Sequence, residues 1–137
     1  MVKTGYKQTE IGILPDAWDT ITFENCFTIL PNNTLSRAEL NYNSGEVQNI
    51  HYGDILVKFP AVLDCSAEGL PYINAENTTK DSEGFLRDGD LIVADTAEDV
   101  IVGKSTEVIG IGERKIVSGL HTIPCRPKMR KCLHLDG

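Results

Sequence analysis

The chain lacks the features that would assign it to a membrane, repeat or common hydrolase class. No apolar run approaches the roughly 18–20 residues that a membrane-spanning helix needs, and no segment repeats at a solenoid-like period. The Gly-x-Ser-x-Gly elbow and the His-Glu-x-x-His helix are both missing, so neither a serine hydrolase nor a zinc peptidase is indicated. Residues 1–18 contain no apolar signal core, which predicts a cytoplasmic protein.

Cysteine is scarce and irregularly spaced. The four cysteines form no Cys-x-x-Cys pair, so neither a disulfide framework nor a zinc ribbon is predicted. One Cys/His cluster near the end of the chain has ligand types that suit zinc: His121, Cys125, Cys132 and His134. We interpret this cluster as accidental, because its spacing matches no zinc motif. Similarly, Asp88-Gly89-Asp90 lacks the spacing of a calcium loop and predicts a turn. We therefore predict no metal site and no catalytic residues.

Positive charge is scarce over most of the chain and concentrated near its end. The net charge of the 137 residues is −7, which argues against a protein that simply coats nucleic acid. Residues 10–113 carry 19 acidic residues and five Lys or Arg, whereas residues 114–131 carry six Lys or Arg and no acid. This asymmetry predicts either a basic edge on an acidic body or a solvated basic tail.

Short β-branched runs separated by turn residues dominate the second half of the sequence. They predict strands at 91–94, 100–102, 107–111, 116–117 and 120–123. Earlier segments are predicted as a helix at 22–28, a helical turn at 36–40, a strand at 55–59 and irregular structure at 62–85. Because the second half of the sequence contains no long crossover helix, we predict an α+β (mixed α/β) fold. It would be a single domain with a twisted, mainly antiparallel or mixed sheet and a few short helices.

Apolar positions of these elements predict the core: Trp18, Phe23, Ile55, Leu56, Val57, Leu91, Ile92, Val93, Ile101, Val117, Leu120 and Ile123. His121 alternates with apolar neighbours, which predicts a partly buried histidine on a strand. His51 precedes Tyr52-Gly53-Asp54, which predicts a tight turn with a histidine in it, not a general base.

Gly103-Lys104-Ser105 has the form of the end of a phosphate-binding loop. Such a loop needs a glycine five residues before Gly103, but that residue is Glu98. It should also open a helix, whereas the β-branched residues that follow predict a strand. A nucleotide-binding protein is therefore the least favoured interpretation. The favoured one is a hairpin turn in which Gly103 adopts unusual backbone angles and Lys104 faces solvent or a partner.

An ordered set of segments resembles a known family. Pro15 with Trp18 is followed by Gly53-Asp54, then by Leu86 with Gly89-Asp90. The remaining segments are Val102-Gly103-Lys104, Ser118–Thr122 and Arg126-Pro127. In this order, over residues 7–128, they resemble the target recognition domain of a type I restriction–modification specificity subunit. The division that follows is an arm at 1–14, the recognition domain at 15–128 and a tail at 129–137.

The resemblance implies a non-enzymatic function. A domain of this family recognises one half of a split double-stranded DNA target. Modification (methyltransferase) and restriction subunits, its partners, use S-adenosylmethionine, ATP and Mg²⁺, so this chain needs no cofactor of its own. The 137 residues include neither the family's spacer helix nor a second recognition domain. An alternative is therefore a truncated fragment that acts by protein–protein interaction or self-association.

Loop residues of suitable chemistry predict the DNA contacts. Lys and Arg bind phosphates, whereas Asn and Arg also recognise base edges. The predicted contacts are Arg37, Asn43, Lys58, Asn77, Thr79, Lys80, Lys104, Ser105, Arg114 and Lys115. Lys58 and Lys104 are the strongest choices, because they are isolated cations in an acidic stretch. The competing interpretation is that these residues only cover polar loops.

Overall fold

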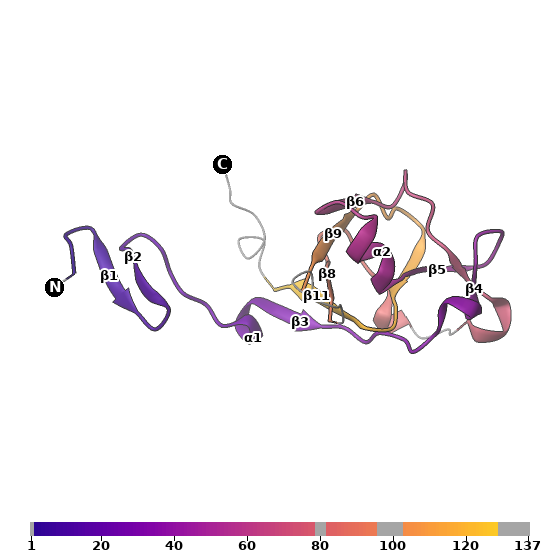
Figure 1. Cartoon of the computed structure of the whole chain (residues 1–137), viewed down its shortest axis with the longest axis horizontal. Coiled ribbons are helices and arrows are strands. Elements are labelled where there is room, and N and C mark those ends of the chain that lie inside the picture. The colour runs from indigo at the N-terminus through magenta and orange to yellow at the C-terminus, as the bar shows by residue number, and fades with distance from the viewer. Residues whose placement is uncertain (1, 79–81, 96–102, 129–137) are drawn as a thin grey trace.

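The computed structural model describes residues 2–78, 82–95 and 103–128, and it has an α+β fold (Figure 1). Its strands are β1 (Tyr6–Thr9), β2 (Gly12–Pro15), β3 (Phe27–Ile29), β4 (Leu40–Asn41), β5 (Val47–Ile50), β6 (Val62–Asp64), β7 (Tyr72–Ile73), β8 (Leu91–Ala94), β9 (Ser105–Ile109), β10 (Lys115–Ser118) and β11 (Thr122–Pro127). Its helices are α1 (Phe23–Cys26) and α2 (Tyr52–Val57), with 3-10 turns at Arg37–Glu39, Ala75–Asn77 and Ser82–Gly84. The predicted single α+β domain is thus confirmed.

A five-stranded sheet forms the larger part of the body. Its order is β3-β11-β8-β9-β6, antiparallel except for the parallel pair of β6 and β9. Alternate residues of β8 and β9, among them Ile92 and Val108, point inward and are fully buried. They belong to the main core, together with Ile55 from α2 and Phe59, which follows the helix. The inner face of this sheet therefore lies against α2.

A four-stranded sheet in the order β10-β5-β7-β4 forms the other part. It is mixed, because β10 and β5 are parallel, whereas β7 pairs antiparallel with both of its neighbours. Val47, Ile73 and Val117 form a second, smaller core on it. The chain passes from this sheet into the five-stranded sheet at the turn between β10 and β11, where the Gly119 N–H continues the β10–β5 pairing by donating to the Ile50 carbonyl at 3.0 Å.

The strand predicted at 55–59 is wrong, because residues 52–57 form α2. The His51 ring accepts a hydrogen bond from the Gly53 N–H at 3.0 Å and so caps the first turn. Ile55 and Phe59 are four residues apart and both buried, which is helical spacing. A short apolar run such as Ile55–Val57 fits a strand or a helix equally well by periodicity. The His51 cap and the burial of Ile55 and Phe59 in the core select the helix over the strand.

Most of the other predicted elements are confirmed with shifted boundaries. The strand at 91–94 matches β8, and those at 107–111, 116–117 and 120–123 overlap β9, β10 and β11. The helix at 22–28 shortens to α1, and the helical turn at 36–40 is a 3-10 turn. The strand predicted at 100–102 and the core residue Ile101 lie outside the described residues. The irregular region at 62–85 contains β6, β7 and two 3-10 turns.

The N-terminal residues differ most from the prediction. In the segment predicted as an N-terminal arm, β1 and β2 form an antiparallel hairpin that stands away from the body (Figure 1). Trp18 and Phe23, predicted as core, are exposed by 60% and 52% of their surface. The apolar residues between Pro15 and Phe23 therefore do not anchor this segment in the body.

Burial also corrects two other core and strand assignments. Ile55, Ile92 and Val117 are buried as predicted, whereas Val57 is 82% exposed. Leu56, Leu91, Val93, Leu120 and Ile123 are partly buried. His121 lies in the turn before β11 with a φ of 57° and is exposed. It does not alternate with apolar residues on a strand, because the turn after Gly119 reverses the chain there.

Candidate nucleic-acid interface

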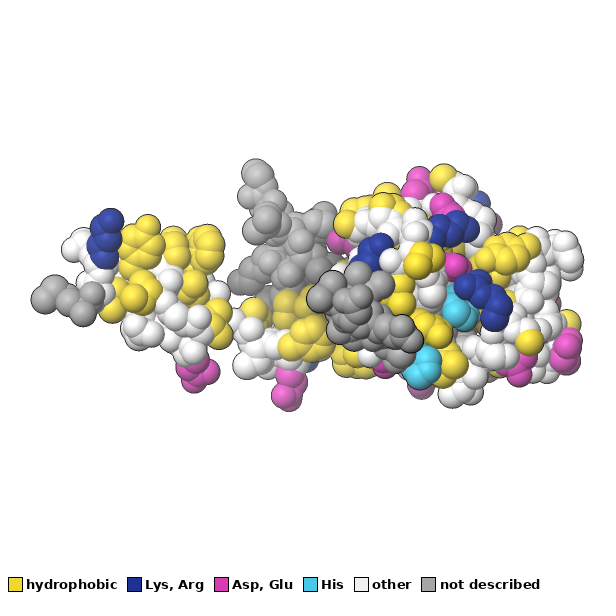
Figure 2. Space-filling view, viewed as in Figure 1, with side chains coloured by type: hydrophobic (Ala, Val, Ile, Leu, Met, Phe, Trp, Pro, Cys, Tyr) yellow, Lys and Arg dark blue, Asp and Glu magenta, His cyan; other side chains and the backbone are white. Residues whose placement is uncertain are grey.

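Three of the predicted cations meet around α2, although they come from distant parts of the sequence. Arg37 lies in the loop before β4, Lys58 caps the end of α2, and Lys104 precedes β9. Figure 2 shows Lys, Arg and His side chains gathered on the face of the body that carries α2 in Figure 1. We call the surface formed by Arg37, His51, Lys58 and Lys104 the α2 face.

Arg37 is fixed at the N-terminal end of the helix. Its guanidinium donates from two nitrogens to the Asp54 carboxylate, at 3.3 and 3.1 Å, and one nitrogen also donates to the Tyr42 hydroxyl at 3.4 Å. The hydrogen bond to Asp54 raises the pKa of Arg37. The Arg37 side chain is 48% exposed and that of Asp54 only 12%, so the pair presents its positive member to solvent.

His51 connects this cluster to the helix cap. Its Nδ1 accepts from the Gly53 N–H and lies 3.2 Å from the Arg37 guanidinium, so neutral His51 carries its proton on Nε2. Burial, with the nearby Arg37 charge, lowers the pKa of His51, and Asp54 opposes the shift. The ring stacks on Tyr52 with centroids 4.8 Å apart. His51 is thus the N-cap of α2 and is held neutral, and the tight turn predicted at residues 51–54 is instead the first turn of this helix.

Tyr52 extends the α2 face toward the β10–β11 turn. Its ring meets His121 edge-on with centroids 5.2 Å apart. The Nδ1 of His121 lies 3.5 Å from the Asp95 carboxylate. Sequence reasoning assigned no role to Tyr52 or His121 beside the helix, because only folding brings the two segments together. The His-Tyr-Gly-Asp run was the available signal.

The other two cations lie at the C-terminal end of α2. Lys104 donates from Nζ to the Leu56 carbonyl at 3.2 Å, where a positive charge interacts favourably with the last carbonyls of a helix. Lys58 forms an ion pair of 3.1 Å with Glu68, which raises the pKa of Lys58. Lys58 was predicted at a strand end and instead follows a helix. Lys104 was predicted to face solvent or a partner, but it is partly buried against α2.

The phosphate-loop interpretation of Lys104 loses its structural support. Gly103 has a φ of 89°, as predicted, and pairs through its N–H with the Ala94 carbonyl at 2.9 Å. Strand β9 follows Lys104 directly, where a phosphate loop would open a helix. Gly103 therefore marks the place where the chain re-enters the sheet beside β8. The residues between β8 and Gly103 are not described beyond Asp95.

The remaining predicted contacts that the structure describes do not join the α2 face. Ser105 lies on β9 opposite Val93. Arg114 and Lys115 line an open groove of about 430 Å³ with Glu46, Gln48, Tyr72 and Glu113 at the four-stranded sheet. Asn43 is exposed in the loop after β4, where its N–H donates to the Asn41 side chain at 2.9 Å. Thr79 and Lys80 lie outside the described residues.

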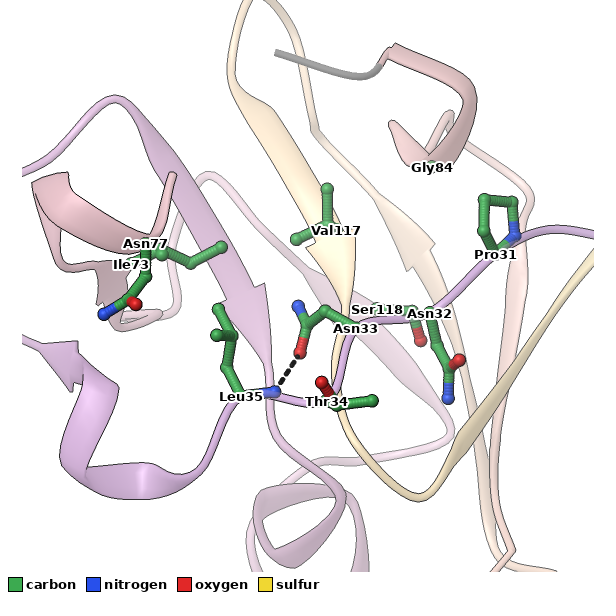
Figure 3. Close-up of a pocket in the computed structure, with 10 residues that line it drawn as sticks. All are labelled: Pro31, Asn32, Asn33, Thr34, Leu35, Ile73, Asn77, Gly84, Val117 and Ser118. Atoms are coloured by element: carbon green, nitrogen blue, oxygen red, sulfur yellow. Dashed lines mark hydrogen bonds between the residues drawn. The ribbon is translucent and has the colours of Figure 1, made fainter. Parts of the chain in front are cut away.

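Asn77 lines a separate pocket of about 320 Å³ beside the four-stranded sheet (Figure 3). Its other lining residues are Pro31, Asn32, Asn33, Thr34, Leu35, Ile73, Gly84, Val117 and Ser118. Asn33 is held by two hydrogen bonds, from the Leu35 N–H at 3.1 Å and to the Asn49 side chain at 2.7 Å. None of the residues that line this pocket is charged, so it suits a neutral polar group better than an ion.

Several of the segments that carry the family resemblance build the scaffold, whereas two of their residues, Asp54 and Lys104, lie at the α2 face. Asp90 accepts two hydrogen bonds from Arg126, at 3.0 and 2.8 Å, and one from the Arg87 N–H at 2.8 Å. Gly119 packs so closely that an added Cβ would lie 2.7 Å from the Ile50 carbonyl oxygen. Only glycine fits there without a shift of the backbone. These residues fix the sheets that hold α2.

The described cysteines are buried thiols. Burial raises the pKa of Cys65 and of Cys125 to about 11, so both are protonated and unreactive at neutral pH. Among the residues that the structure describes, no group of three His, Cys, Asp or Glu side chains could hold a metal ion. Two members of the zinc cluster considered above, Cys132 and His134, lie beyond the described range. The described helices also include none that is long and apolar enough to span a membrane.

No protein-family profile matches the chain, and no curated protein sequence matches it. Function is therefore argued from the α2 face and from the resemblance of the motifs.

Proposed function

We propose that this chain is a non-catalytic domain that recognises double-stranded DNA, of the kind found in type I specificity subunits. The observation that carries the proposal is the convergence of Arg37, Lys58 and Lys104 on the α2 face. Lys and Arg from separate loops on one surface are what a duplex backbone requires. The order of the scaffold motifs is the second support.

The ion pairs on this face reconcile DNA binding with a net charge of −7. In both pairs the cation is more exposed than its acid: Arg37 at 48% against Asp54 at 12%, and Lys58 at 46% against Glu68 at 31%. Lys104 donates to a backbone carbonyl, and no carboxylate neutralises it among the ion pairs of the described residues. The face that would meet a phosphate is therefore locally positive, while acids elsewhere repel misplaced DNA.

Sequence recognition would come from Arg37 and from asparagines outside the α2 face. The half-exposed Arg37 guanidinium offers its charge and its Nε–H to a phosphate or a guanine edge, and Asn43 and Asn77 carry carboxamides that can pair with adenine. In the proposed assembly, modification and restriction subunits would bind to this domain and supply the methyltransferase and nuclease chemistry. The chain itself would use no cofactor.

The test is duplex binding by fluorescence anisotropy, first with a random-sequence pool and then with the sequences it enriches. We expect binding at low salt that weakens as salt rises, with a log–log slope of about −0.9 for each phosphate contact. Lys104→Met should reduce that slope by about 0.9 and weaken binding to all sequences alike. Arg37→Ala should weaken binding more for the enriched sequences.

Lys128→Ala is the matched control, because it removes one positive charge from the end of β11 beside α1, away from α2. Circular dichroism and thermal melting check that Lys104→Met stays folded, since Lys104 also caps α2. Absence of binding at low salt would refute the proposal. So would variants of Lys58 and Lys104 that bind no more weakly than Lys128→Ala.

A further inference from the structure

The pocket beside the four-stranded sheet combines an apolar wall with neutral hydrogen-bonding groups (Figure 3). Ile73 and Val117 are buried and belong to the smaller core, and Leu35 packs against them. The volume of about 320 Å³ lies at the lower end of the range of about 300–1,000 Å³ for small-molecule pockets. The pocket is therefore large enough for one ring system whose face lies on apolar side chains.

Three of the polar groups that line this pocket keep hydrogen-bonding capacity. Among the described residues, the Asn77 carboxamide and the Thr34 hydroxyl form no hydrogen bond. Asn32 donates from Nδ2 to the Thr122 carbonyl at 3.0 Å, which fixes the side chain and leaves its carboxamide oxygen available. A carboxamide presents two donor hydrogens and one acceptor oxygen. The pocket can therefore both donate to and accept from the edge of one ligand.

A buried donor lies beneath one wall of the pocket. The Asn33 side chain in that wall is fixed, because its Oδ1 accepts from the Leu35 N–H at 3.1 Å and its Nδ2 donates to the Asn49 Oδ1 at 2.7 Å. The same contact orients Asn49, which is fully buried, and leaves its Nδ2 with no hydrogen-bond partner among the described residues. Asn49 lies opposite Val117 in the parallel pair, so both side chains are on the pocket side of the sheet. An unpaired buried donor is unfavourable, so an acceptor that enters beside Asn33 would gain from it.

The pocket is neutral, but two chain segments connect it to the positive α2 face. None of the residues that line it is charged. Leu35 in its wall is two residues before Arg37, and Asn49 beneath it is two residues before His51, so the Cα atoms within each of these two pairs are at most about 7 Å apart. Arg37 and His51 both belong to the α2 face. A nucleotide has the same division, since an uncharged base is joined to an anionic phosphate.

We propose that the pocket binds one nucleobase that is turned out of the stack of a duplex bound at the α2 face, an inference that rests on the proposed DNA-binding function. The phosphate of that nucleotide would lie at Arg37, and the base would lie on the apolar wall with its edge at Asn77. Adenine is the base that a carboxamide pairs with through two hydrogen bonds. An anionic group would not enter, because no cation lines the pocket to neutralise it.

Three duplexes that differ at one position test this inference by fluorescence anisotropy. The first is fully paired, the second carries one unpaired adenine, and the third carries an abasic residue in place of that adenine. Turning out a base costs least when the base has no partner, so we expect the second duplex to bind about tenfold more tightly than the first. The abasic duplex keeps the bulge and the phosphates but has no base, so it should bind like the fully paired one. Equal binding of the adenine and abasic duplexes would overturn the proposal.

Gly84→Leu fills the pocket without removing a polar group. A Cβ at Gly84 would lie 3.5 Å from the Pro31 carbonyl oxygen and 4.0 Å from the Val117 Cγ1, which are ordinary contact distances between groups that line the pocket. Gly69→Leu is the matched control, because a Cβ there meets nothing within 4 Å. We expect Gly84→Leu to lose the tenfold preference for the unpaired adenine. Its affinity for the fully paired duplex, and the salt dependence of that affinity, should equal those of Gly69→Leu.

Asn77→Leu removes the carboxamide and leaves the pocket open. We expect it to lose most of the preference for the unpaired adenine, and Asn77→Gln, which keeps a carboxamide, to restore part of it. Circular dichroism and thermal melting check that each variant is folded. If Gly84→Leu does not fold, Asn77→Leu still tests the proposal. A folded Asn77→Leu that keeps the full preference would overturn the assignment of this pocket.

Competition with adenosine distinguishes a base of the DNA from a free nucleoside. Adenosine at high concentration should weaken binding of the unpaired-adenine duplex to the wild type and leave binding of the fully paired duplex unchanged. Adenosine that binds the chain while the unpaired adenine gives no preference would overturn the DNA as the source of the base. Loss of the preference alone leaves the proposed function of the α2 face intact, whereas failure to bind any of the three duplexes refutes that function itself.

Discussion

The same dipeptide, Gly-Asp, is used in two different ways in this chain. Gly53-Asp54 begins α2, whereas Gly89-Asp90 leads into β8. Each carboxylate accepts hydrogen bonds from one arginine, Asp54 from Arg37 and Asp90 from Arg126. The Asp90–Arg126 pair is the more buried, with side-chain exposures of 2% and 24% against 12% and 48% for Asp54–Arg37.

This difference separates scaffold from surface. Arg126 donates three hydrogen bonds, two to Asp90 and one to the Phe85 carbonyl at 3.1 Å, and its side chain is only 24% exposed, so little of it can reach a ligand. Arg37 is half exposed and sits beside Tyr42 and His51. A buried pair fixes the position of two strands, whereas a half-exposed pair orients a cation toward solvent. Four sets of substitutions test this distinction, from the largest effect to the smallest.

Breaking the buried pair should have the largest effect. Asp90→Asn or Arg126→Met leaves one buried charge without its partner, so we expect a loss of about 3–5 kcal/mol in the free energy of unfolding. Urea denaturation followed by circular dichroism measures it. The double variant should lose clearly less than the sum of the single losses, because the two residues act on each other. Losses no larger than those of the Asp54–Arg37 pair would remove the distinction.

Arg37→Ala should cost less stability and more function. Asp54 is mostly buried but keeps some contact with water, so we expect a loss of about 1–2 kcal/mol from its missing partner. Arg37→Lys is the conservative comparison, because a lysine carries the charge but cannot form the two parallel hydrogen bonds. We expect Arg37→Lys to keep part of the duplex affinity that Arg37→Ala loses. Equal affinities of both variants with the wild type would exclude Arg37 from the DNA surface.

The two Gly-Asp segments, one at the start of α2 and one before β8, also show what could and could not be predicted from the sequence. Residues 91–94 were predicted correctly as a strand because their β-branched run is fully supported by a turn before it. Residues 55–59 were predicted wrongly, since the helix depends on core contacts of Ile55 and Phe59, which are not local, in addition to the local His51 cap. The convergence of Lys104 on Leu56, 48 positions apart, carries no sequence signal at all.

The N-terminal arm shows that burial, too, cannot be predicted from composition alone. Trp18 and Phe23 have the composition of core residues, and composition alone predicts burial. Their exposure follows from the tertiary arrangement, in which the hairpin does not fold onto the body (Figure 1). Among the site residues chosen for their charge, Arg37, Lys58 and Lys104 lie together around α2, whereas Arg114 and Lys115 line another groove. Their contact with DNA stays a prediction.

A change of pH should act on the α2 face through His51. Burial and Arg37 lower the pKa of His51 in the folded chain, whereas the unfolded chain titrates near about 6.5. Above that pH the His51 ring is neutral in both the folded and the unfolded chain, so its contribution to the free energy of unfolding is fully present. As pH falls through about 6.5, the unfolded chain takes up a proton first, so stability falls until the folded pKa is passed.

The measurement is the melting temperature between about pH 7.5 and about pH 5.5, the range in which histidines titrate. His51→Gln is the control, because it cannot titrate while the other histidines still do. We expect the wild type to lose more stability than His51→Gln as the pH falls, since protonated Nδ1 can no longer accept from Gly53. Parallel curves for the two proteins would show that His51 does not carry this dependence.

The smallest effect on stability is expected for the exposed pair of Lys58 and Glu68, which are 3.1 Å apart. Surface ion pairs contribute little, so Lys58→Met and Glu68→Gln should each change the free energy of unfolding by less than about 0.5 kcal/mol. Their effects on duplex binding should have opposite signs. Lys58→Met removes a phosphate contact and lowers affinity, whereas Glu68→Gln frees the lysine from its acid and raises it. Both variants lose the same ion pair. Opposite changes in duplex affinity at unchanged stability can therefore only come from the charge presented to DNA. Equal changes in affinity would instead make Lys58 part of the scaffold.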